Sequence, residues 1–104
     1  MHEGDAYRIN RRRRNEVVVL GGGALKYESY PFIPVIPVVD GLGEKETFFA
    51  ARISEPVRGV VLVLDMEPVH RRLLEEGELL GSISRYELDA VKTLLRIAHD
   101  LDSG

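Results

Sequence analysis

The order of the apolar patterns, with short strand-like runs first and one amphipathic helix last, most constrains what this chain can fold into. Runs rich in Val, Ile, Phe and Tyr, each bounded by Gly, Pro or charged residues, predict strands over 6–9, 16–20, 32–39, 47–53 and 59–64. The fourth and fifth runs are expected to form a tight pair. No repeat or change in composition marks a second domain, so we expect residues 1–104 to form a single α+β domain.

The final element is predicted to be a helix that packs across the sheet. Ser84 and Glu87 fit a capping box, and apolar residues at helical spacing follow them. That apolar stripe consists of Leu88, Val91, Leu94, Leu95, Ala98 and Leu101. Tyr86, Ala90 and Ile97 widen the stripe beyond what one sheet face needs, which is explained either by a wide core face or by a subunit interface.

Three prolines shape the expected sheet. Pro31, Pro34 and Pro37 recur at every third position of the third run. Proline gives no N–H donor to a sheet, so this segment is expected to lie on an edge or to switch between extended and polyproline-like backbone. We therefore expect a strongly bent antiparallel sheet.

Composition excludes some classes of protein. The chain has no cysteine, so it forms no disulfide and no thiolate metal site, which fits the reducing cytoplasm. The longest apolar run, 57–66, is interrupted by charge and is shorter than the roughly 20 residues of a membrane helix. We expect a cytoplasmic protein with no contact with the membrane, no bound metal and no cofactor.

The charge is distributed unevenly. The formal net charge is −3, yet residues 1–30 hold six Lys or Arg against four acids, and the block at 11–14 is Arg-Arg-Arg-Arg. This block can clamp phosphates, with Arg8 and Lys26 extending the patch, or it can be a solvated hairpin loop. A polyanion is expected to meet this N-terminal part of the chain.

Several local strings, in the same order and over nearly the whole chain, resemble those of the MazF/PemK toxin family. They are EGDAY at 3–7, NEVVVL at 15–20, PVV at 37–39, GVVLVLD at 59–65 and GSIS at 81–84. Glu3 stands where the family has an arginine. The resemblance implies a bent SH3-like barrel sheet with a C-terminal helix. It also implies the toxin of a type II toxin–antitoxin pair, a homodimeric endoribonuclease that cleaves single-stranded mRNA and binds the acidic tail of an antitoxin protein.

The CcdB gyrase poisons share this architecture and give an alternative. MEPV at 66–69 is similar to a CcdB string. However, CcdB chains end in a Trp-Gly-Ile that recognises gyrase, whereas this chain has no tryptophan and ends in Asp-Ser-Gly. A CcdB-like poison and a catalytically degenerate binding protein of the same fold are therefore the alternatives to a nuclease.

RNA cleavage by 2′-hydroxyl attack needs a base, an acid and positive charge near the phosphate. The family arginine falls at Asn15, and a shift of one residue lets Arg14 take this role, since a guanidinium reaches a phosphate from several backbone positions. The family threonine falls at Val39, which has no polar side-chain atom. Asp65 matches a position that some PemK-type toxins use in catalysis, although an aspartate there is also a common turn residue.

His70 completes the candidate site. It is expected in the turn after Asp65, where it can act as an acid–base group near that carboxylate or be solvent-exposed. The predicted catalytic residues are thus Arg14, Asp65 and His70. The predicted RNA-binding residues are Arg8, Arg11, Arg12, Arg13 and Lys26.

Overall fold

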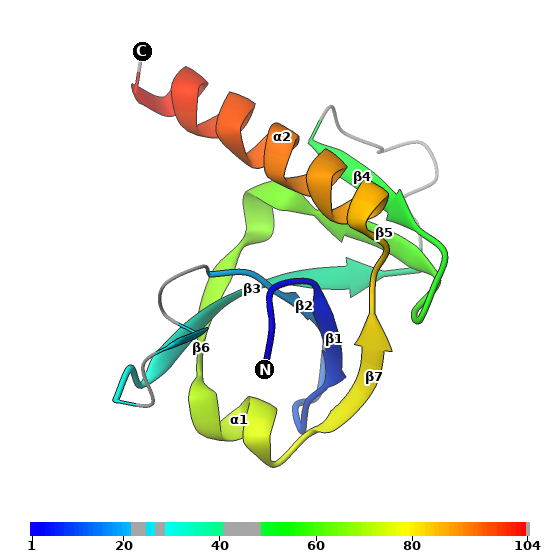
Figure 1. The fold of residues 1–104 in the computed structure, drawn as a ribbon, viewed down its shortest axis with the longest axis vertical. Helices are drawn as coiled ribbons and strands as arrows, with labels where there is room; N and C mark the ends of the chain where they lie inside the picture. The colour runs from blue at the N-terminus through cyan, green and yellow to red at the C-terminus, as the bar shows by residue number, and fades with distance from the viewer. Residues whose placement is uncertain (22–24, 27–28, 41–48, 104) are drawn as a thin grey trace.

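A curled antiparallel sheet with a long helix across one end forms the molecule (Figure 1). The computed structural model describes residues 1–21, 25–26, 29–40 and 49–103, without the side chains of 102 and 103. Its strands are β1 (Asp5–Arg8), β2 (Glu16–Val19), β3 (Phe32–Val39), β4 (Ala50–Ile53), β5 (Gly59–Leu62), β6 (Glu67–His70) and β7 (Glu78–Ser82). The helices are the 3₁₀ turn η3 (Val63–Asp65), α1 (Arg71–Glu75) and α2 (Arg85–Ser103). None of these helices is long and apolar enough to span a membrane.

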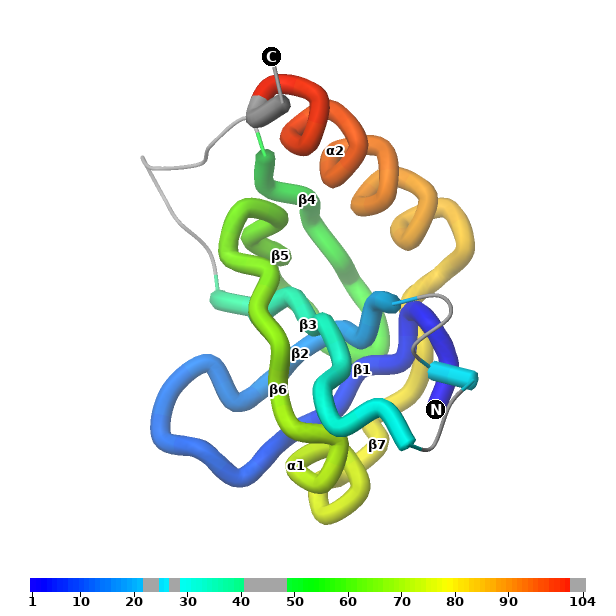
Figure 2. Tube along the Cα trace, turned by 90° about the vertical axis from the view of Figure 1, so that its left-hand side faces the viewer, coloured from blue at the N-terminus to red at the C-terminus, as the bar shows by residue number. Residues whose placement is uncertain are grey.

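The eight-residue β3 is the centre of the sheet. The strand order is β4-β5-β3-β2-β1-β7, and β6 also pairs with β3. On one edge β3 pairs with β2, and on the other its first half pairs with β6 and its last two residues pair with β5. One strand therefore belongs to two differently directed parts of the sheet, which curls around it (Figure 2).

The expectation that the proline-rich run lies on an edge is wrong, because β3 is paired on both sides. Pro34 lies opposite Pro68 of β6, and its carbonyl accepts a hydrogen bond from Leu20 N at 2.9 Å on the β2 side. In an antiparallel pair such positions alternate, so the Pro34–Pro68 pair needs no N–H between the strands. Pro37 lies between the stretch paired with β6 and the stretch paired with β5. A central strand thus tolerates these prolines.

The sheet buries an apolar cluster on each face. Alternate residues of β2 and β3 supply the two clusters, which explains why β2 reads Val-Val-Val. The cluster under α2 includes Val18, Leu20, Ile36, Val38, Val61 and Val91. The opposite cluster, which α1 closes, includes Tyr7, Ile9, Val17, Val19, Ile33, Val35, Val69 and Leu74.

The α2 helix begins as predicted, with a difference at its cap. Ser84 Oγ accepts from Glu87 N at 3.1 Å, but the Glu87 carboxylate accepts from Ser54 N at 3.0 Å and so ties the β4–β5 connection to the helix. Val91 is fully buried, whereas Tyr86, Ala90 and Ile97, which widen the predicted stripe, are exposed, and so is Leu101. The reading of Tyr86, Ala90 and Ile97 as part of a wide core face is therefore wrong, because this face of α2 stays uncovered.

The predicted strands are confirmed in order, with two omissions. The tight pair is β4 with β5, joined from Ala50 opposite Leu62 to Ile53 opposite Gly59. The run at 47–53 begins at two residues that lie outside the described part of the chain. Both β6 and β7 were missed, since each is short and carries charge, proline or glycine in place of an apolar alternation.

Leu74 and Leu79 should differ in how much each contributes to the stability of the fold, because only Leu74 belongs to the cluster closed by α1. Leu74 is fully buried, whereas Leu79 of β7 is 56% exposed. Leu74→Ala should lower the free energy of unfolding by about 2–5 kcal/mol, because a cavity forms. Leu79→Ala should lower it by less than about 1 kcal/mol. Urea unfolding measures both free energies, and equal losses of stability would contradict a core on this face of the sheet.

Candidate functional site

The connection between β1 and β2, residues 9–15, forms a loop that projects from the sheet (Figure 2). Ile9 N donates to Asn15 O at 2.7 Å across the base of the loop, and the Ile9 side chain is buried in the second cluster. The loop is thus fixed at both ends, and the four consecutive arginines form its tip and its return to β2.

Arg14 contacts Asp65, which is 51 residues away in the sequence. Arg14 Nη1 donates to Asp65 Oδ2 at 2.9 Å, and the two side chains are 46% and 42% exposed. Asp65 is the last residue of η3, just before β6. The pairing of β6 with β3 brings this carboxylate to the β1–β2 loop. Two residues that the sequence singled out separately therefore form one exposed pair.

Arg11 binds within the protein. Its Nε and Nη2 donate to Arg14 O at 3.0 and 2.8 Å, and its Nη1 donates to Glu67 Oε1. Glu67 begins β6, two residues after Asp65. Arg14 has a φ of 50°, in the left-handed region that few residues other than glycine adopt. The segment 65–67 thus holds the loop at two points.

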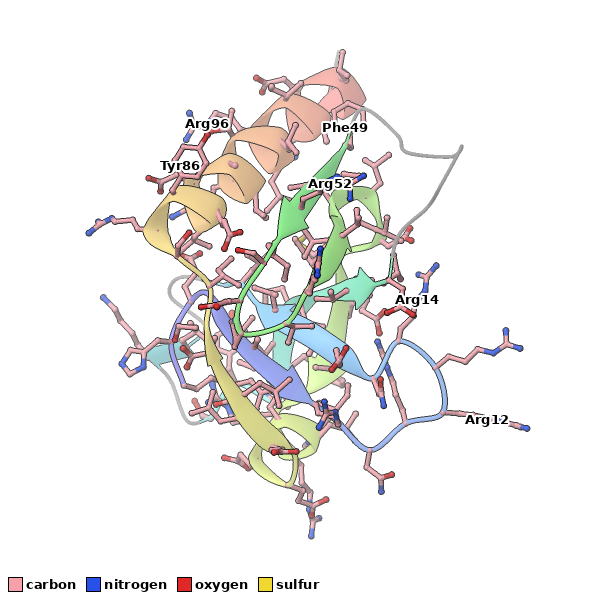
Figure 3. The ribbon with its side chains drawn as sticks, turned by 90° about the vertical axis from the view of Figure 1, so that its right-hand side faces the viewer. Arg12, Arg14, Phe49, Arg52, Tyr86 and Arg96 are labelled. Carbon is pink, nitrogen blue, oxygen red and sulfur yellow. The ribbon has the colours of Figure 1, made fainter. Side chains whose placement is uncertain are left out.

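Arg12 and Arg13 are exposed, whereas Arg11 is half-buried. Figure 3 shows Arg12 at the tip of the loop, directed away from the sheet, and Arg14 at the return to β2. Within the described residues, neither Arg12 nor Arg13 has a hydrogen bond or ion pair. Their guanidinium groups are available to an anion.

Arg8 is occupied by carboxylates of the neighbouring strands. It donates to Glu16 at 2.9 Å and to Glu78 at 3.2 Å, which joins β1 to β2 and β7. The hydrogen bond and charge of Glu16, followed by Glu78, raise the pKa of the Arg8 guanidinium. Arg8 is thus tied to the sheet rather than directed into the loop.

Lys26 does not lie with the arginines. It follows β2, and Figure 2 shows residues 25 and 26 on the opposite side of the molecule from the loop. The structure therefore separates Lys26 from the rest of the predicted RNA-binding patch.

His70 does not lie beside Asp65. It caps α1, where its Nδ1 accepts from Arg72 N at 3.1 Å, and its ring meets the edge of Phe32 with centroids 5.5 Å apart. The whole of β6, roughly 13 Å long at the usual rise per residue, separates it from Asp65. The expected proximity of the two acid–base candidates is absent.

A cleft of about 420 Å³ runs beside the loop, between it and the connection from α1 to β7. Its lining is polar and carries both charges: Arg8, Ile9, Asn10, Arg11, Asn15, Glu76, Gly77 and Glu78. Among the described residues, no group of three or more His, Asp or Glu side chains is arranged to hold a metal ion.

The position that resembles the family threonine is apolar. Val39 ends β3, is partly buried and lies opposite Val60 of β5. Asp40, directly after it, is exposed and lines a separate cleft of about 260 Å³ with Arg52, Ser54, Arg58 and Glu87. The end of β3 therefore offers a carboxylate but no hydroxyl.

Sequence reasoning missed Glu67 and the inward role of Arg11. The spacing gave no periodic signal for this pair of carboxylates, because Asp65 ends the 3₁₀ turn η3 and only Glu67 lies in the extended strand β6. Both carboxylates meet arginines of the same loop.

No protein-family model matches the sequence, and the search of curated proteins finds no significant match. Solved structures do match. An endoribonuclease from Mycobacterial species has a TM-score of 0.79 at 15% identity, covering 96% of this chain and 91% of that one. An endoribonuclease in complex with its cognate antitoxin, also from Mycobacterial species, has a TM-score of 0.76 at 18% identity, covering 97% and 96%. The MazE–MazF structure from Deinococcus radiodurans has a TM-score of 0.74 at 22% sequence identity, covering 91% of each chain. The chain has the MazF fold.

The exposure of the Arg14–Asp65 pair predicts a small contribution to stability. Solvent screens an ion pair whose two side chains are more than a third exposed, so such pairs contribute about 0–1 kcal/mol. Arg14→Ala and Asp65→Asn should each change the free energy of unfolding by less than about 1 kcal/mol. Urea unfolding measures this change, and a loss of stability above about 2 kcal/mol in either variant would contradict the small contribution expected for the pair.

Proposed function

We propose that this protein is a MazF-type toxin of a type II toxin–antitoxin pair, an endoribonuclease that cuts single-stranded mRNA without a cofactor. The observation that carries the proposal is the Arg14–Asp65 pair at 2.9 Å, exposed beside the two outward arginines of the same loop. It places a permanent cation and a carboxylate where a phosphate and its neighbouring hydroxyl can reach both. The MazF fold supports the same reading.

The reaction follows from these two groups. The Asp65 carboxylate accepts the proton of a ribose 2′-hydroxyl, whose oxygen attacks the adjacent phosphorus. The bond from phosphorus to the 5′-oxygen breaks, and that oxygen takes a proton from water. The hydroxide that remains takes the proton held by Asp65, which restores the carboxylate. The products are a 2′,3′-cyclic phosphate and a 5′-hydroxyl. Arg14 stabilises the negative charge that grows on the phosphate oxygens, and because the nucleophile belongs to the substrate, this route needs no metal.

The other cations are assigned to RNA binding by their surroundings. Arg12 and Arg13, exposed at the loop tip, contact the phosphates on either side of the cut. The 420 Å³ cleft next to the loop accepts an unpaired base, which the Asn10 and Asn15 amides can meet at its edge. His70 and Lys26 lie away from this site and have no role in the proposed reaction.

The partners follow from charge and exposed surface. An antitoxin with an acidic tail would cover the cationic loop, and the similarity to an endoribonuclease in complex with its cognate antitoxin and to MazE–MazF supports such a partner. Tyr86, Ile97 and Leu101 leave an apolar strip on α2 that a second copy can cover, which supports a homodimer with RNA across it. Because mRNA and its translation are cytoplasmic, we propose that the protein acts in the cytoplasm.

A second candidate function keeps the fold and loses the chemistry. Val39 gives no hydroxyl at the end of β3, and this favours a catalytically degenerate protein that binds RNA without cutting it. The similarity to endoribonuclease structures favours either RNA-directed function over a gyrase poison.

A cleavage assay distinguishes these functions. The purified protein and a long RNA, incubated in EDTA, should give discrete fragments, and Arg14→Ala should lower the rate by about 100-fold because one donor to the developing charge is lost. The matched control is Arg96→Ala on α2, on the other side of the molecule (Figure 3), which should cut like the wild type. Bound but intact RNA would favour the degenerate protein, and intact RNA with stalled gyrase would favour the poison.

RNA binding should depend on salt through the loop tip. For single strands, each neutralised phosphate contributes about 0.7 to the slope of log K against log salt. Arg12→Ala and Arg13→Ala should each reduce the slope by about that amount, whereas Arg96→Ala should leave it unchanged. Fluorescence anisotropy on a labelled oligonucleotide measures the slope, and unchanged slopes in both loop variants would place the RNA elsewhere.

A further inference from the structure

We propose that Arg11 and Glu67 are positioning residues, which hold the β1–β2 loop in the conformation that presents Arg14 to the scissile phosphate. This inference rests on the proposed function, since it concerns the same site. It differs from the expectation that Arg11 binds RNA directly alongside Arg12 and Arg13.

Three of the five N–H donors of Arg11 are already committed inside the protein. A guanidinium has five N–H groups, and Arg11 directs its Nε, Nη1 and Nη2 at the Arg14 carbonyl and the Glu67 carboxylate. Its side chain is 25% exposed, less than that of any other lysine or arginine whose ion pair the structure describes. The remaining two N–H groups belong to a side chain that is mostly covered, so Arg11 is poorly placed to bind a phosphate.

Arg11 donates two hydrogen bonds to the backbone of Arg14, the proposed catalytic residue. Arg14 has a φ of 50°, which a residue with a side chain keeps only where its surroundings impose it. Two hydrogen bonds to the Arg14 carbonyl, at 3.0 and 2.8 Å, restrain that peptide directly. Arg11 thus sets the direction in which the Arg14 side chain leaves the loop.

Glu67 connects this restraint to the carboxylate of the site. It starts β6 and lies opposite Val35 in the centre of the sheet, two residues after Asp65. The segment 65–67 therefore holds the Arg14 side chain through Asp65 and its backbone through Glu67 and Arg11. Removing either Glu67 or Arg11 leaves Arg14 able to reach a phosphate but no longer fixed in direction.

The expected kinetic effect separates positioning from binding. Misplacement of a catalytic group lowers the rate of the chemical step, so Arg11→Ala should lower kcat roughly 10- to 100-fold and change KM less than about threefold. The salt slope of RNA binding should stay that of the wild type. A raised KM with a reduced slope, as expected for Arg12→Ala, would make Arg11 a phosphate contact and overturn the proposal.

Rescue by a conservative variant tests the Glu67 contact. Glu67→Gln keeps an oxygen that accepts from Arg11 and should keep kcat within about threefold of the wild type, whereas Glu67→Ala should reproduce Arg11→Ala. The variant that carries both Arg11→Ala and Glu67→Ala should be no slower than either single variant, because the two substitutions remove the same restraint on Arg14. Additive losses, or a Glu67→Gln as slow as Glu67→Ala, would contradict the shared role.

A readout without RNA keeps this inference separate from the proposed function. In Arg11→Ala and Glu67→Ala, the NMR backbone order parameters of residues 12–15 should fall below about 0.6, while those of β1 and β2 stay as in the wild type. If the wild type does not cut RNA, the proposed function fails and the restraint on Arg14 is still decided by these order parameters. Unchanged order parameters in the loop would refute the restraint, and a fall throughout β1 and β2 would show that the pair only stabilises the fold.

Discussion

The attachment of one arginine-rich loop to one short segment of the sheet is the interaction on which the site depends. Arg14 pairs with Asp65, and Arg11 joins the backbone of Arg14 to Glu67. Both carboxylates are in place only because β6 turns back along β3. The exposed ion pairs add little to stability, so the apolar clusters on the two faces of the sheet hold the fold and the loop contacts shape the site.

Within the four arginines, position in the loop decides what each can do. Arg11 points back to the protein, Arg14 meets a carboxylate at the return to β2, and Arg12 and Arg13 face solvent. A block that reads as uniform charge in the sequence is thus divided into a restraint, a proposed catalytic group and two proposed phosphate contacts. Lys26 is not part of this site, because residues 25 and 26 lie on the opposite side of the molecule from the loop (Figure 2).

The sequence predicted more of the fold than of the site. Long apolar runs and the capping Ser84 identified five strands and the final helix, because burial sets their periodicity. The strands β6 and β7 lack that signal. For β3 the prolines predicted an edge or a switch to polyproline-like backbone, and the edge is wrong because Pro34 lies opposite Pro68, where no N–H donor is needed between the strands. Arg14 and Asp65 were identified by chemistry and resemblance, but their contact across 51 residues depends on the strand that was missed.

The chemical nature of the RNA ends tests the central claim most directly. Attack by a 2′-hydroxyl beside Arg14 and Asp65 leaves a 2′,3′-cyclic phosphate on one fragment and a 5′-hydroxyl on the other. Mass spectrometry of the fragments should find these ends in EDTA, and a substrate with a single 2′-deoxy nucleotide before the cut should stay intact. Fragments with 3′-hydroxyl and 5′-phosphate ends, or cutting of the deoxy substrate, would contradict the account.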